Sequence, residues 1–321
     1  MAETMNPPLV SVVMSLYNSE RYLTEAMDSI LAQTFTDFEF IIIDDGSKDR
    51  GADIVRSYED PRIRCFWQEN AGLPAALNFA VRNAQADVVA RMDPDDICMP
   101  DRLAKQYNYL MHHPDVVIVG SNATCIDDTG NKLEDVQMRP FYATGEFSLP
   151  ESPCVHPSVI FRRSAFERAG GYPERMRYGG EDAVLFNKMM TFGAISNIPE
   201  PLISYRLSHS SMSHKSREFN RLLREMVLKE VSGEAISNED WQILADAYKH
   251  SASGHYGYYL YIGKLFLTSS GKESIARTYI IKALRNSPLS LHAWMCLAGS
   301  FIPEAWRAPI RSYLKNLKRI K

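Results

Sequence analysis

Two clusters of carboxylates, each directly after an apolar run typical of a buried strand, are the residues of this chain best suited to chemistry. The first is Asp44-Asp45-Gly46-Ser47 after Phe40–Ile43, and the second is Asp93-Pro94-Asp95-Asp96 after Val88–Met92. Carboxylates gathered at the ends of buried strands repel one another unless a cation joins them. A divalent metal that carries a nucleotide is the natural partner of such a group. The two clusters therefore predict chemistry on a phosphate-bearing substrate.

The elements that must position these clusters alternate between strands and helices over the first 120 residues. Apolar runs predict the strands, and apolar residues at helical spacing predict the helices. The predicted strands are Val10–Leu16, Phe38–Ile43, Ile63–Trp67, Asp87–Met92 and Val116–Gly120, and the predicted helices are Glu20–Ala32, Gly51–Tyr58, Leu73–Gln85 and Pro100–His112. Such alternation gives an α/β fold with a mostly parallel sheet, in which ligands bind beyond the carboxyl ends of the strands. Both acidic clusters lie at those ends, so one site can use both.

The pattern loosens after residue 120 and is almost entirely helical after about residue 216. Between these points we predict a turn at 127–131, strands at His156–Phe161 and Ile203–Leu207, a chain break at Gly170–Pro173 and a helix at Asp182–Phe192. The later predicted helices are Arg217–Val231, Asn238–Tyr248, Tyr256–Leu267, Lys272–Asn286, Leu289–Ala298 and Glu304–Arg319. A Ser-rich stretch at 210–216 marks the predicted boundary between an N-terminal domain, residues 1–215, and a C-terminal all-α domain, residues 216–321.

Bulk composition narrows the class of protein. The chain has 321 residues, of which 45% are hydrophobic, enough for a sizeable core and about two domains. Its net charge of −3 gives no bias toward nucleic acid, so no nucleic-acid partner is expected. Five scattered cysteines without a CxxC pair fit reduced thiols better than a disulfide framework or a zinc site. No signal peptide or membrane-spanning run is expected, which indicates a cytoplasmic protein, either soluble or peripheral on the inner face of the cytoplasmic membrane.

A series of short motifs follows one another along residues 9–215. They are Ser11–Asn18, Ile43–Ser47, Asn70–Leu73, Leu77-Asn78, Ala90–Asp96, Pro100–Leu103, His156–Val159, Gly170–Tyr172, Glu181-Asp182 and Tyr205-Arg206. Each motif is weak by itself, but the ordered set is specific. In this order the motifs resemble the family 2 glycosyltransferases, of the bacterial cell-surface polysaccharide or lipopolysaccharide type. The resemblance implies the GT-A fold, which has a Rossmann-like, mostly parallel mixed sheet.

The resemblance assigns roles to the second acidic cluster. Asp93-Pro94-Asp95 has the form of the family's D-x-D motif, and residues two apart on an extended segment point the same way. By resemblance, Asp95 binds Mn²⁺ or Mg²⁺ and Asp93 contacts the ribose or the metal, which bridges the two phosphates of a nucleotide-sugar. The alternative is a turn that caps the next helix, and we favour that role for Asp96 and Asp101. Arg91 points the same way as Asp93 and is a candidate partner for a site carboxylate.

The resemblance also places the nucleotide base at the first acidic cluster. It puts Asp45 on the imide NH of a uracil or thymine ring, and a carboxylate suits this position because it only accepts hydrogen bonds. Asp44 is expected to support the turn. The other nucleotide-binding candidates are Ser15, Leu16 and Tyr17, whose backbone groups could hold the base, and Asn70, which shapes the loop near the diphosphate. Tyr17 either stacks on the base or simply packs.

Asp182, near the start of a predicted helix, is the candidate catalytic residue. Attack by a sugar hydroxyl needs a proton acceptor close to the incoming oxygen. By resemblance, the Glu181-Asp182 pair supplies this general base through Asp182. Glu181 either raises the proton affinity of the pair by like-charge repulsion or orients the acceptor. The alternative is ordinary electrostatics, since acidic residues are favoured at helix N-termini in any case.

Two histidines and an arginine are supporting candidates. By resemblance, His209 completes the metal shell or touches the diphosphate, although it lies one residue beyond the commonest spacing after Tyr205-Arg206, and a satisfied surface histidine is an equal alternative. His156 is expected to hydrogen-bond the backbone rather than to take part in chemistry. Arg206 is a possible support residue.

Residues 303–321 carry six basic residues and one acidic residue, a balance of +5. The basic residues Arg307, Arg311, Lys315 and Lys318 share one face of the predicted helix, and apolar residues share another. This pattern predicts an interfacial helix attracted to anionic lipid, and a solvated cap on the helical domain is the alternative.

Together these residues predict a metal-dependent hexosyltransferase, inverting by resemblance, that moves sugar from a UDP-sugar to a hydroxyl of a glycan or lipid-linked acceptor. A sugar-1-phosphate nucleotidylyltransferase is one alternative, but it would need a Gly-rich, basic loop where this chain has Leu16–Glu20. A non-catalytic GT-A scaffold is the other. Such a scaffold has no need of Asp45, Asp93, Asp95 and Asp182 together, because clustered charges cost desolvation energy.

Overall fold

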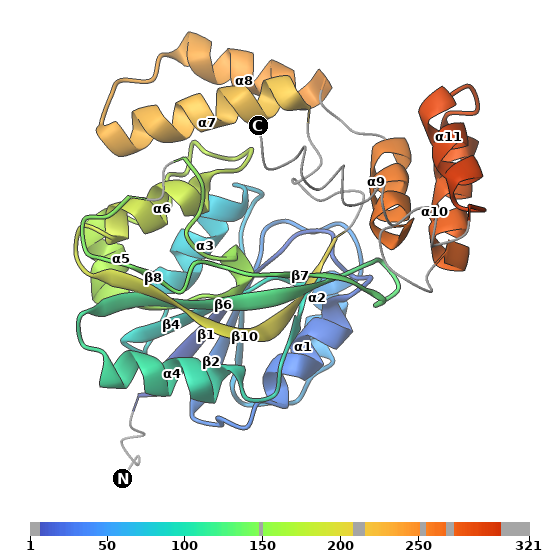
Figure 1. Ribbon diagram of the computed structural model, residues 1–321. Coiled ribbons are helices and arrows are strands. Elements are labelled where there is room, and N and C mark those ends of the chain that lie inside the picture. The colour runs from blue at the N-terminus through green and yellow to red at the C-terminus, as the bar shows by residue number, and fades with distance from the viewer. Residues whose placement is uncertain (1–6, 148–149, 208–215, 251–254, 268–272, 303–321) are drawn as a thin grey trace.

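The computed structural model describes residues 7–147, 150–207, 216–250, 255–267 and 273–302, and these residues form a mixed sheet between helices (Figure 1). The strands are β1 Val10–Leu16, β2 Phe38–Asp44, β3 Ile63–Trp67, β4 Val88–Met92, β5 Ile97–Cys98, β6 Val116–Ile126, β7 Lys132–Val136, β8 Phe141–Tyr142, β9 Ile160–Arg162 and β10 Ala194–Arg206. Their order in the sheet is β3-β2-β1-β4-β9-β6-β10-β5, with β7 beside β6 and β8 beside β10.

The strands that carry the acidic clusters end at one edge of the sheet. β1 pairs in parallel with β2 and β4, and β6 pairs in parallel with β10. β9 lies antiparallel to both β4 and β6, so these two parallel sets run in the same direction. The carboxyl ends of β1, β2, β4, β6 and β10 therefore share an edge, as the strand–helix alternation predicts for the first three.

Helices cover both faces of the sheet. On one face lie α1 Leu23–Leu31, α2 Gly51–Arg56 and α4 Arg102–His112, and on the other lie α3 Leu73–Arg82, α5 Arg163–Ala169 and α6 Glu181–Met189. Alternation along β1 divides its side chains between the two faces. Val12 and Met14 pack under α1, whereas Val13 packs under α3. The two cores fix the height at which each strand ends, and so they fix the site.

The C-terminal helices form two groups that pack in different places (Figure 1). They are α7 Arg217–Ser232, α8 Asn238–His250, α9 His255–Leu267, α10 Glu273–Asn286 and α11 Leu291–Gly299. α7 and α8 share a core with α6, through Phe219 and Met226 against Val184. α9 and α10 share another with the β6–β7 hairpin, through Tyr258 and Tyr279. Packing therefore crosses the predicted boundary at residue 215.

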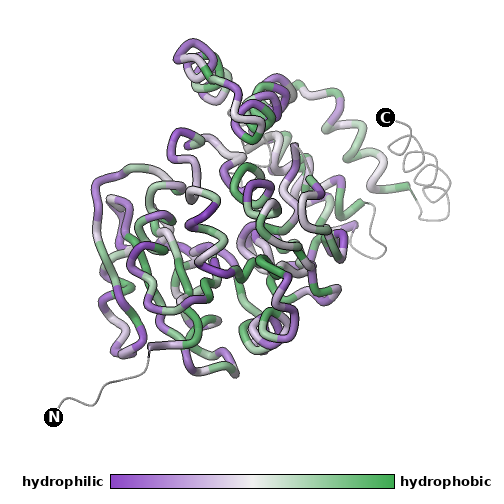
Figure 2. The backbone as a smooth tube through the Cα atoms, turned by 90° about the vertical axis from the view of Figure 1, so that its left-hand side faces the viewer, coloured by the Kyte–Doolittle hydropathy of each residue, from purple (hydrophilic) through white to green (hydrophobic). Residues whose placement is uncertain are grey.

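Hydropathy along these helices agrees with that packing. The tube in Figure 2 alternates between purple and green along the C-terminal helices, as expected where each helix has one face on a core and one in water. None of the described helices is long and apolar enough to cross a membrane. The helix predicted at Glu304–Arg319 lies outside the described residues.

Several predicted elements differ from the observed ones. The strand predicted at His156–Phe161 is wrong in its first half, because His156–Ser158 form a 3₁₀ turn around Pro157 and β9 begins only at Ile160. β6 runs on to Ile126, and the strand predicted at Ile203–Leu207 is the end of the long β10. The predicted turn at 127–131 is confirmed as the β6–β7 connection. α5, β5, β7 and β8 carry too few apolar residues in periodic order for the sequence to predict them.

The capping role predicted for Asp96 and Asp101 is wrong. Asp101 lies at the N-cap position of α4 but makes no capping hydrogen bond, and its carboxylate pairs with Lys105 Nζ at 2.7 Å. Asp96 is buried and accepts a hydrogen bond from the backbone NH of Arg206 at 2.7 Å. The cross-sheet contact with β10 draws Asp96 inward, and a local sequence pattern cannot show such a contact.

A buried arginine fastens β4 to β9 at the point where the chain leaves the sheet for the second acidic cluster. Arg102 is fully buried at the start of α4. Its Nη2 donates to the carbonyls of Arg91 at 2.7 Å and Val159 at 3.2 Å, and its Nε donates to Gln106 Oε1 at 3.0 Å. Because both carbonyls belong to the strand ends around the site, Arg102 fixes the base of the acidic loop.

We expect Arg102→Met to lower the free energy of unfolding by about 3 kcal/mol, because it removes the buried hydrogen bonds from the guanidinium to the carbonyls of Arg91 and Val159 and to Gln106. Urea denaturation followed by circular dichroism measures this loss. The control is Arg56→Met, which removes a surface ion pair with Asp53 and should cost less than about 0.5 kcal/mol. Equal urea midpoints for the two variants would contradict the role given to Arg102.

Candidate active site

A cleft of about 960 Å³ opens at the carboxyl edge of the sheet. Its walls come from the ends of β1, β2, β4 and β10, from the loops at 70–74 and 177–182, from the 3₁₀ turn and from α8. The predicted site residues that line it are Ser15, Tyr17, Asp45, Asn70, Asp93, Asp95, His156, Glu181, Asp182 and Arg206. Leu16 is fully buried behind the wall, and its carbonyl accepts from the backbone NH of Asp45 at 2.8 Å. His209 lies outside the described residues.

The second acidic cluster converges on one point. Asp93, Asp95 and Asp96 can each offer a carboxylate oxygen within 4.8 Å of the others. The buried Arg91 donates to Asp93 Oδ2 at 2.5 Å, which confirms it as the partner of a site carboxylate. Arg91 neutralises one carboxylate of the three, which leaves an acidic excess in a shielded place.

The pKa values of this cluster indicate which kind of ligand it would favour. Burial, and then the charge of Asp93, raises the pKa of Asp95 to about 7. Burial and the neighbouring Asp95 raise the pKa of Asp96 well above its usual value, and its Oδ2 is buried without a hydrogen-bond partner. A divalent cation favours oxygen ligands and would relieve this repulsion. The residues present therefore fit Mn²⁺ or Mg²⁺.

Arg206, at the end of β10, holds the acidic loop from the side. Its backbone NH donates to Asp96 Oδ1 at 2.7 Å, and its Nε donates to the carbonyl of Asp95 at 2.8 Å. Its Nη2 pairs with Glu25 at 2.5 Å. The side chain is buried, and it supports the loop that presents Asp95.

The first acidic cluster organises the opposite wall. Asp45 Oδ1 accepts from Gln68 Nε2 at 2.6 Å and from the backbone NH of Ala71 at 2.8 Å, and Oδ2 accepts from that of Gly72 at 2.9 Å. Two carboxylate oxygens offer about four lone pairs, so Asp45 keeps capacity for one further donor. The expected turn role of Asp44 is confirmed, since its Oδ1 accepts from the backbone NH of Ser47 at 2.8 Å.

The Glu181-Asp182 pair begins α6 on the far side of the cleft. Glu181 is buried and Asp182 is partly buried. Burial, and then the charge of Asp182, raises the pKa of Glu181 to about 8. Burial also raises the pKa of Asp182, against the lowering effect of hydrogen bonds from the Ala183 backbone and the Ser152 hydroxyl. The expected like-charge repulsion is present, and together with burial it favours a proton on Glu181 near neutral pH.

His156 packs behind this pair. Its Nε2 lies 2.9 Å from the Tyr172 hydroxyl, and its Nδ1 lies 3.6 Å from Glu181 Oε1. Burial, and then the charge of Arg91, lowers the pKa of His156 well below its usual value, so the ring is neutral. The expected backbone hydrogen bond is wrong, because both partners are side chains. Tyr172 belongs to one of the quoted motifs, but nothing in the sequence pairs it with His156.

The sequence missed Arg177 and two tyrosines that line the cleft. Arg177 Nη2 donates to the carbonyl of Asn70 at 3.4 Å, and among the described residues Arg177 forms no ion pair. Gly72 leaves room for it, because a Cβ there would lie 2.9 Å from Arg177 Nε. Tyr178 and Tyr248 of α8 pack with ring centroids 4.7 Å apart. No motif marks these residues, because their place depends on how two distant loops and a helix meet.

Comparison with known proteins gives the family. The family model described as "Glycosyl transferase family 2" matches residues 11–170. The amylovoran biosynthesis glycosyltransferase AmsE of Erwinia amylovora is 31% identical over 228 residues, which are 68% of this chain and 84% of that relative. The O-antigen biosynthesis glycosyltransferase WbnJ of Escherichia coli is 31% identical over 215 residues, or 65% and 83%. The chain belongs to glycosyltransferase family 2 and is a glycosyltransferase.

Solved structures confirm the GT-A fold. Staphylococcus aureus TarS in complex with UDP gives a TM-score of 0.55 at 18% identity, covering 86% of this chain and 88% of that one. The mannosyltransferase PcManGT from Pyrobaculum calidifontis, in complex with GDP-Man and Mn²⁺, gives 0.54 at 20% identity, covering 96% and 84%. The α/β sheet with helices that the sequence predicted is therefore the sheet of this fold.

The raised pKa of Glu181 predicts how stability depends on pH. The folded state keeps a proton on Glu181 up to a pKa of about 8, whereas the unfolded chain loses it near 4.5. Between these values the folded state binds more protons, so the free energy of unfolding falls as pH rises. We expect Glu181→Gln, in EDTA, to reduce this slope by up to about 1.4 kcal/mol per pH unit.

Urea titrations from pH 5 to pH 8 measure this effect. The matched control is Glu167→Gln on α5, whose exposed carboxylate should leave the slope unchanged. An unaltered slope in Glu181→Gln would contradict the assignment of the proton to Glu181.

Proposed function

We propose that this glycosyltransferase is a metal-dependent, inverting enzyme that transfers a hexosyl group from a UDP-sugar to a hydroxyl of a glycan or lipid-linked acceptor. One observation carries the proposal. Asp93 and Asp95, from a carboxylate cluster suited to a cation, line the same cleft as a Glu-Asp pair suited to accept a proton. These are the two groups that a single displacement at an anomeric carbon needs.

The donor side of the cleft would hold the diphosphate. Asp95, with Asp93 or Asp96, would bind Mn²⁺ or Mg²⁺, and the bound ion supplies charge neutralisation for the departing diphosphate. His209 stays a predicted ligand, outside the described residues. Arg177 faces the cleft from the opposite loop without a carboxylate partner among the described residues, so it is available to bind a phosphate oxygen.

The nucleotide would lie along the wall made by β1 and β2. Asp45 would accept from the imide NH of uracil, and Tyr17, which is 47% exposed, would contact the base. Ser15 lines the same wall, and Asn70 donates to the carbonyl of Asp45 at 3.0 Å, which fixes the loop near the diphosphate. TarS is solved with UDP and with UDP-GlcNAc, and PcManGT with GDP-Man. Asp45 keeps capacity for one further donor, which suits the single imide NH of uracil better than the paired N1–H and N2–H donors of guanine.

The acceptor side would carry out the proton transfer. The acceptor oxygen attacks the anomeric carbon as the bond from that carbon to the diphosphate breaks, and the hydroxyl proton passes to Asp182. A proton kept on Glu181 would spare Asp182 the repulsion of a second negative charge and so help Asp182 to act as the acceptor. Displacement in one step inverts the anomeric carbon and needs no covalent intermediate.

The acceptor is proposed to lie at an anionic membrane surface on the cytoplasmic side. α11 exposes one apolar face, on which Leu291, Trp294 and Met295 are 74%, 52% and 64% exposed. The basic residues 303–321 follow this helix directly in the sequence. Apolar and basic residues side by side suit the surface of an anionic bilayer. AmsE and WbnJ are named for amylovoran and O-antigen synthesis, which supports a surface-polysaccharide acceptor.

We expect Asp182→Asn to lower kcat by about 10³-fold, because the amide cannot accept the hydroxyl proton. The Kd for UDP should change less than threefold, since the nucleotide is held on the opposite wall. UDP release measured with acceptor, and calorimetry with UDP, give the two values. Asp87→Asn, at an exposed site away from the cleft, is the control. A non-catalytic scaffold would show no UDP release in either variant.

The metal and the donor base are tested by a thermal-shift screen of UDP, GDP, CDP and dTDP sugars with and without Mn²⁺. We expect UDP-sugars to raise the Tm only when Mn²⁺ is present. Asp95→Asn should abolish most of that shift, because it removes a charged oxygen ligand from the cluster. A shift with GDP-sugars alone would replace the proposed donor, and a shift that EDTA leaves intact would remove the metal from the proposal.

A further inference from the structure

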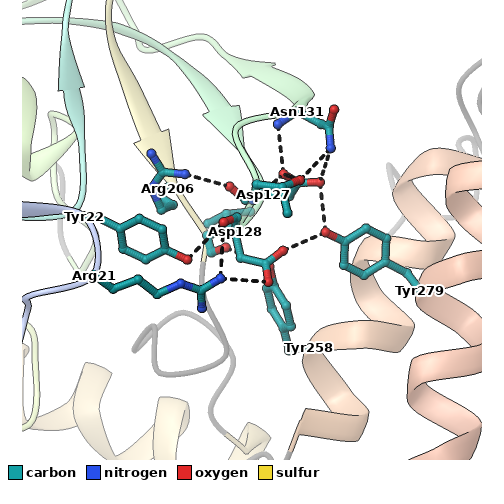
Figure 3. A network of polar contacts seen from close by, with 10 residues as sticks. Arg21, Tyr22, Asp127, Asp128, Asn131, Arg206, Tyr258 and Tyr279 are labelled. Atoms are coloured by element: carbon teal, nitrogen blue, oxygen red, sulfur yellow. Dashed lines mark hydrogen bonds and ion pairs between the residues drawn. The ribbon is translucent and has the colours of Figure 1, made fainter. Parts of the chain in front are cut away.

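We propose that the helix pair α9–α10 sets the position of the metal-binding loop, and that Tyr279 is the positioning residue through which it acts. The proposal rests on the function proposed above, in which Asp95 and its neighbours bind the metal. Figure 3 shows the network of polar contacts that joins the helices to the end of β10. The hub of this network is the turn between β6 and β7.

Asp127, the first residue of that turn, is fully buried and saturated with hydrogen bonds. Its Oδ1 accepts from the backbone NH groups of Thr129 at 2.9 Å and Asn131 at 2.8 Å. Its Oδ2 accepts from Asn131 Nδ2 at 3.0 Å and from the Tyr279 hydroxyl at 2.9 Å. Three of these bonds are made within the turn, whereas Tyr279 is the partner from outside it. The turn is therefore well braced internally, and Tyr279 is the side chain from α10 that holds its Asp127 carboxylate.

Tyr279 is held firmly on its own side. Its hydroxyl also lies 2.7 Å from Asp128 Oδ1, so it bridges both acidic residues of the turn. Burial and these two carboxylates raise its pKa, which keeps the hydroxyl protonated as a donor. α9 and α10 pack closely beside it. At Gly263 of α9 a Cβ would lie only 2.6 Å from Ile280 Cγ1 of α10, so only glycine fits there. The Tyr279 phenol thus joins the helix pair to both carboxylates of the turn.

From the turn, two paths lead to Arg206. The carbonyl of Asp127 accepts from Arg206 Nη1 at 3.1 Å. The carbonyl of Asp128 accepts from the Tyr22 hydroxyl at 3.1 Å, and the guanidinium of Arg206 lies 4.2 Å from the centre of the Tyr22 ring. The turn therefore fixes the guanidinium both directly and through the aromatic surface under it.

Arg206 then contacts the acidic loop at two atoms, the carbonyl of Asp95 and the carboxylate of Asp96. A carboxylate that binds a metal must be held within a few tenths of an ångström, and its neighbours supply that precision. Tyr279 is not among the residues that line the cleft, so its effect on the metal must be indirect, and this chain of contacts gives it a route. Loss of its hydroxyl should loosen the turn, then Arg206, then Asp95.

The test is Tyr279→Phe in the full-length chain, with Mn²⁺ affinity measured by electron paramagnetic resonance and Tm measured in EDTA. We expect about tenfold weaker Mn²⁺ binding, as for the loss of one hydrogen bond to a charged group. At saturating Mn²⁺, kcat should be within twofold of wild type. The control Tyr261→Phe on α9 removes a hydroxyl that faces Glu134 of β7, and it should leave Mn²⁺ affinity unchanged.

A double-mutant cycle separates positioning from simple docking of the helices. If Tyr279 acts through Arg206, the double variant Tyr279→Phe/Arg206→Lys should lose less free energy of Mn²⁺ binding than the two single variants lose in sum. Tyr22→Phe removes the hydrogen bond to the Asp128 carbonyl and should also weaken Mn²⁺ binding. This variant replaces Tyr279→Phe in the test if Tyr279→Phe does not fold. A lower Tm with unchanged Mn²⁺ affinity in Tyr279→Phe would overturn the proposal. Wild-type protein that binds no Mn²⁺ would overturn the proposed function, and this inference with it.

Discussion

Repulsion among buried carboxylates is the constraint on which this structure depends. Asp93 and Asp95 line the cleft with the buried Asp96 next to them, and Glu181 and Asp182 line it as a second group. Neither group would persist in a site chosen for stability alone, because each pair of like charges raises the cost of ionisation. The fold accepts this cost at the edge of the sheet, where a bound cation or a transferred proton would relieve the repulsion. Raised pKa values in both groups are typical of a functional site.

Three buried arginines make the arrangement possible, and each acts in a different way. Arg91 pairs directly with Asp93, and Arg206 holds Asp96 through its backbone and Asp95 through its side chain. Arg102 touches no carboxylate at all and binds the strand ends below the loop instead. Guanidinium groups suit these tasks because five donors in a fixed fork can satisfy several carbonyls at once. The loop is thus held in place without complete neutralisation of its charge.

Local patterns predicted the parts of the site that lie directly after strands. Strand ends carry their side chains to a common edge, so Asp45, Asp93 and Asp95 could be placed from periodicity alone. The inward turn of Asp96 and the position of Arg177 at the cleft could not be predicted in this way. Asp96 depends on a contact with Arg206, 110 residues further along the chain. Arg177 depends on the meeting of two loops that are distant in the sequence. The predicted backbone hydrogen bond of His156 was wrong for a similar reason, since Pro157 turns the chain where a strand was expected.

The boundary predicted at residue 215 separates two compositions, yet the helices beyond it are joined to the two halves of the site. α7 and α8 pack on α6, the helix that begins with Glu181-Asp182, and Tyr248 of α8 lines the cleft. α9 and α10 pack on the hairpin whose turn holds Arg206. One helical group therefore backs the Glu181-Asp182 pair, and the other backs the loop that carries Asp95. α6 buries Leu185 and Phe186 against the sheet and Val184 against α7 and α8, so the sheet and the outer helices together hold the Glu181-Asp182 pair in place.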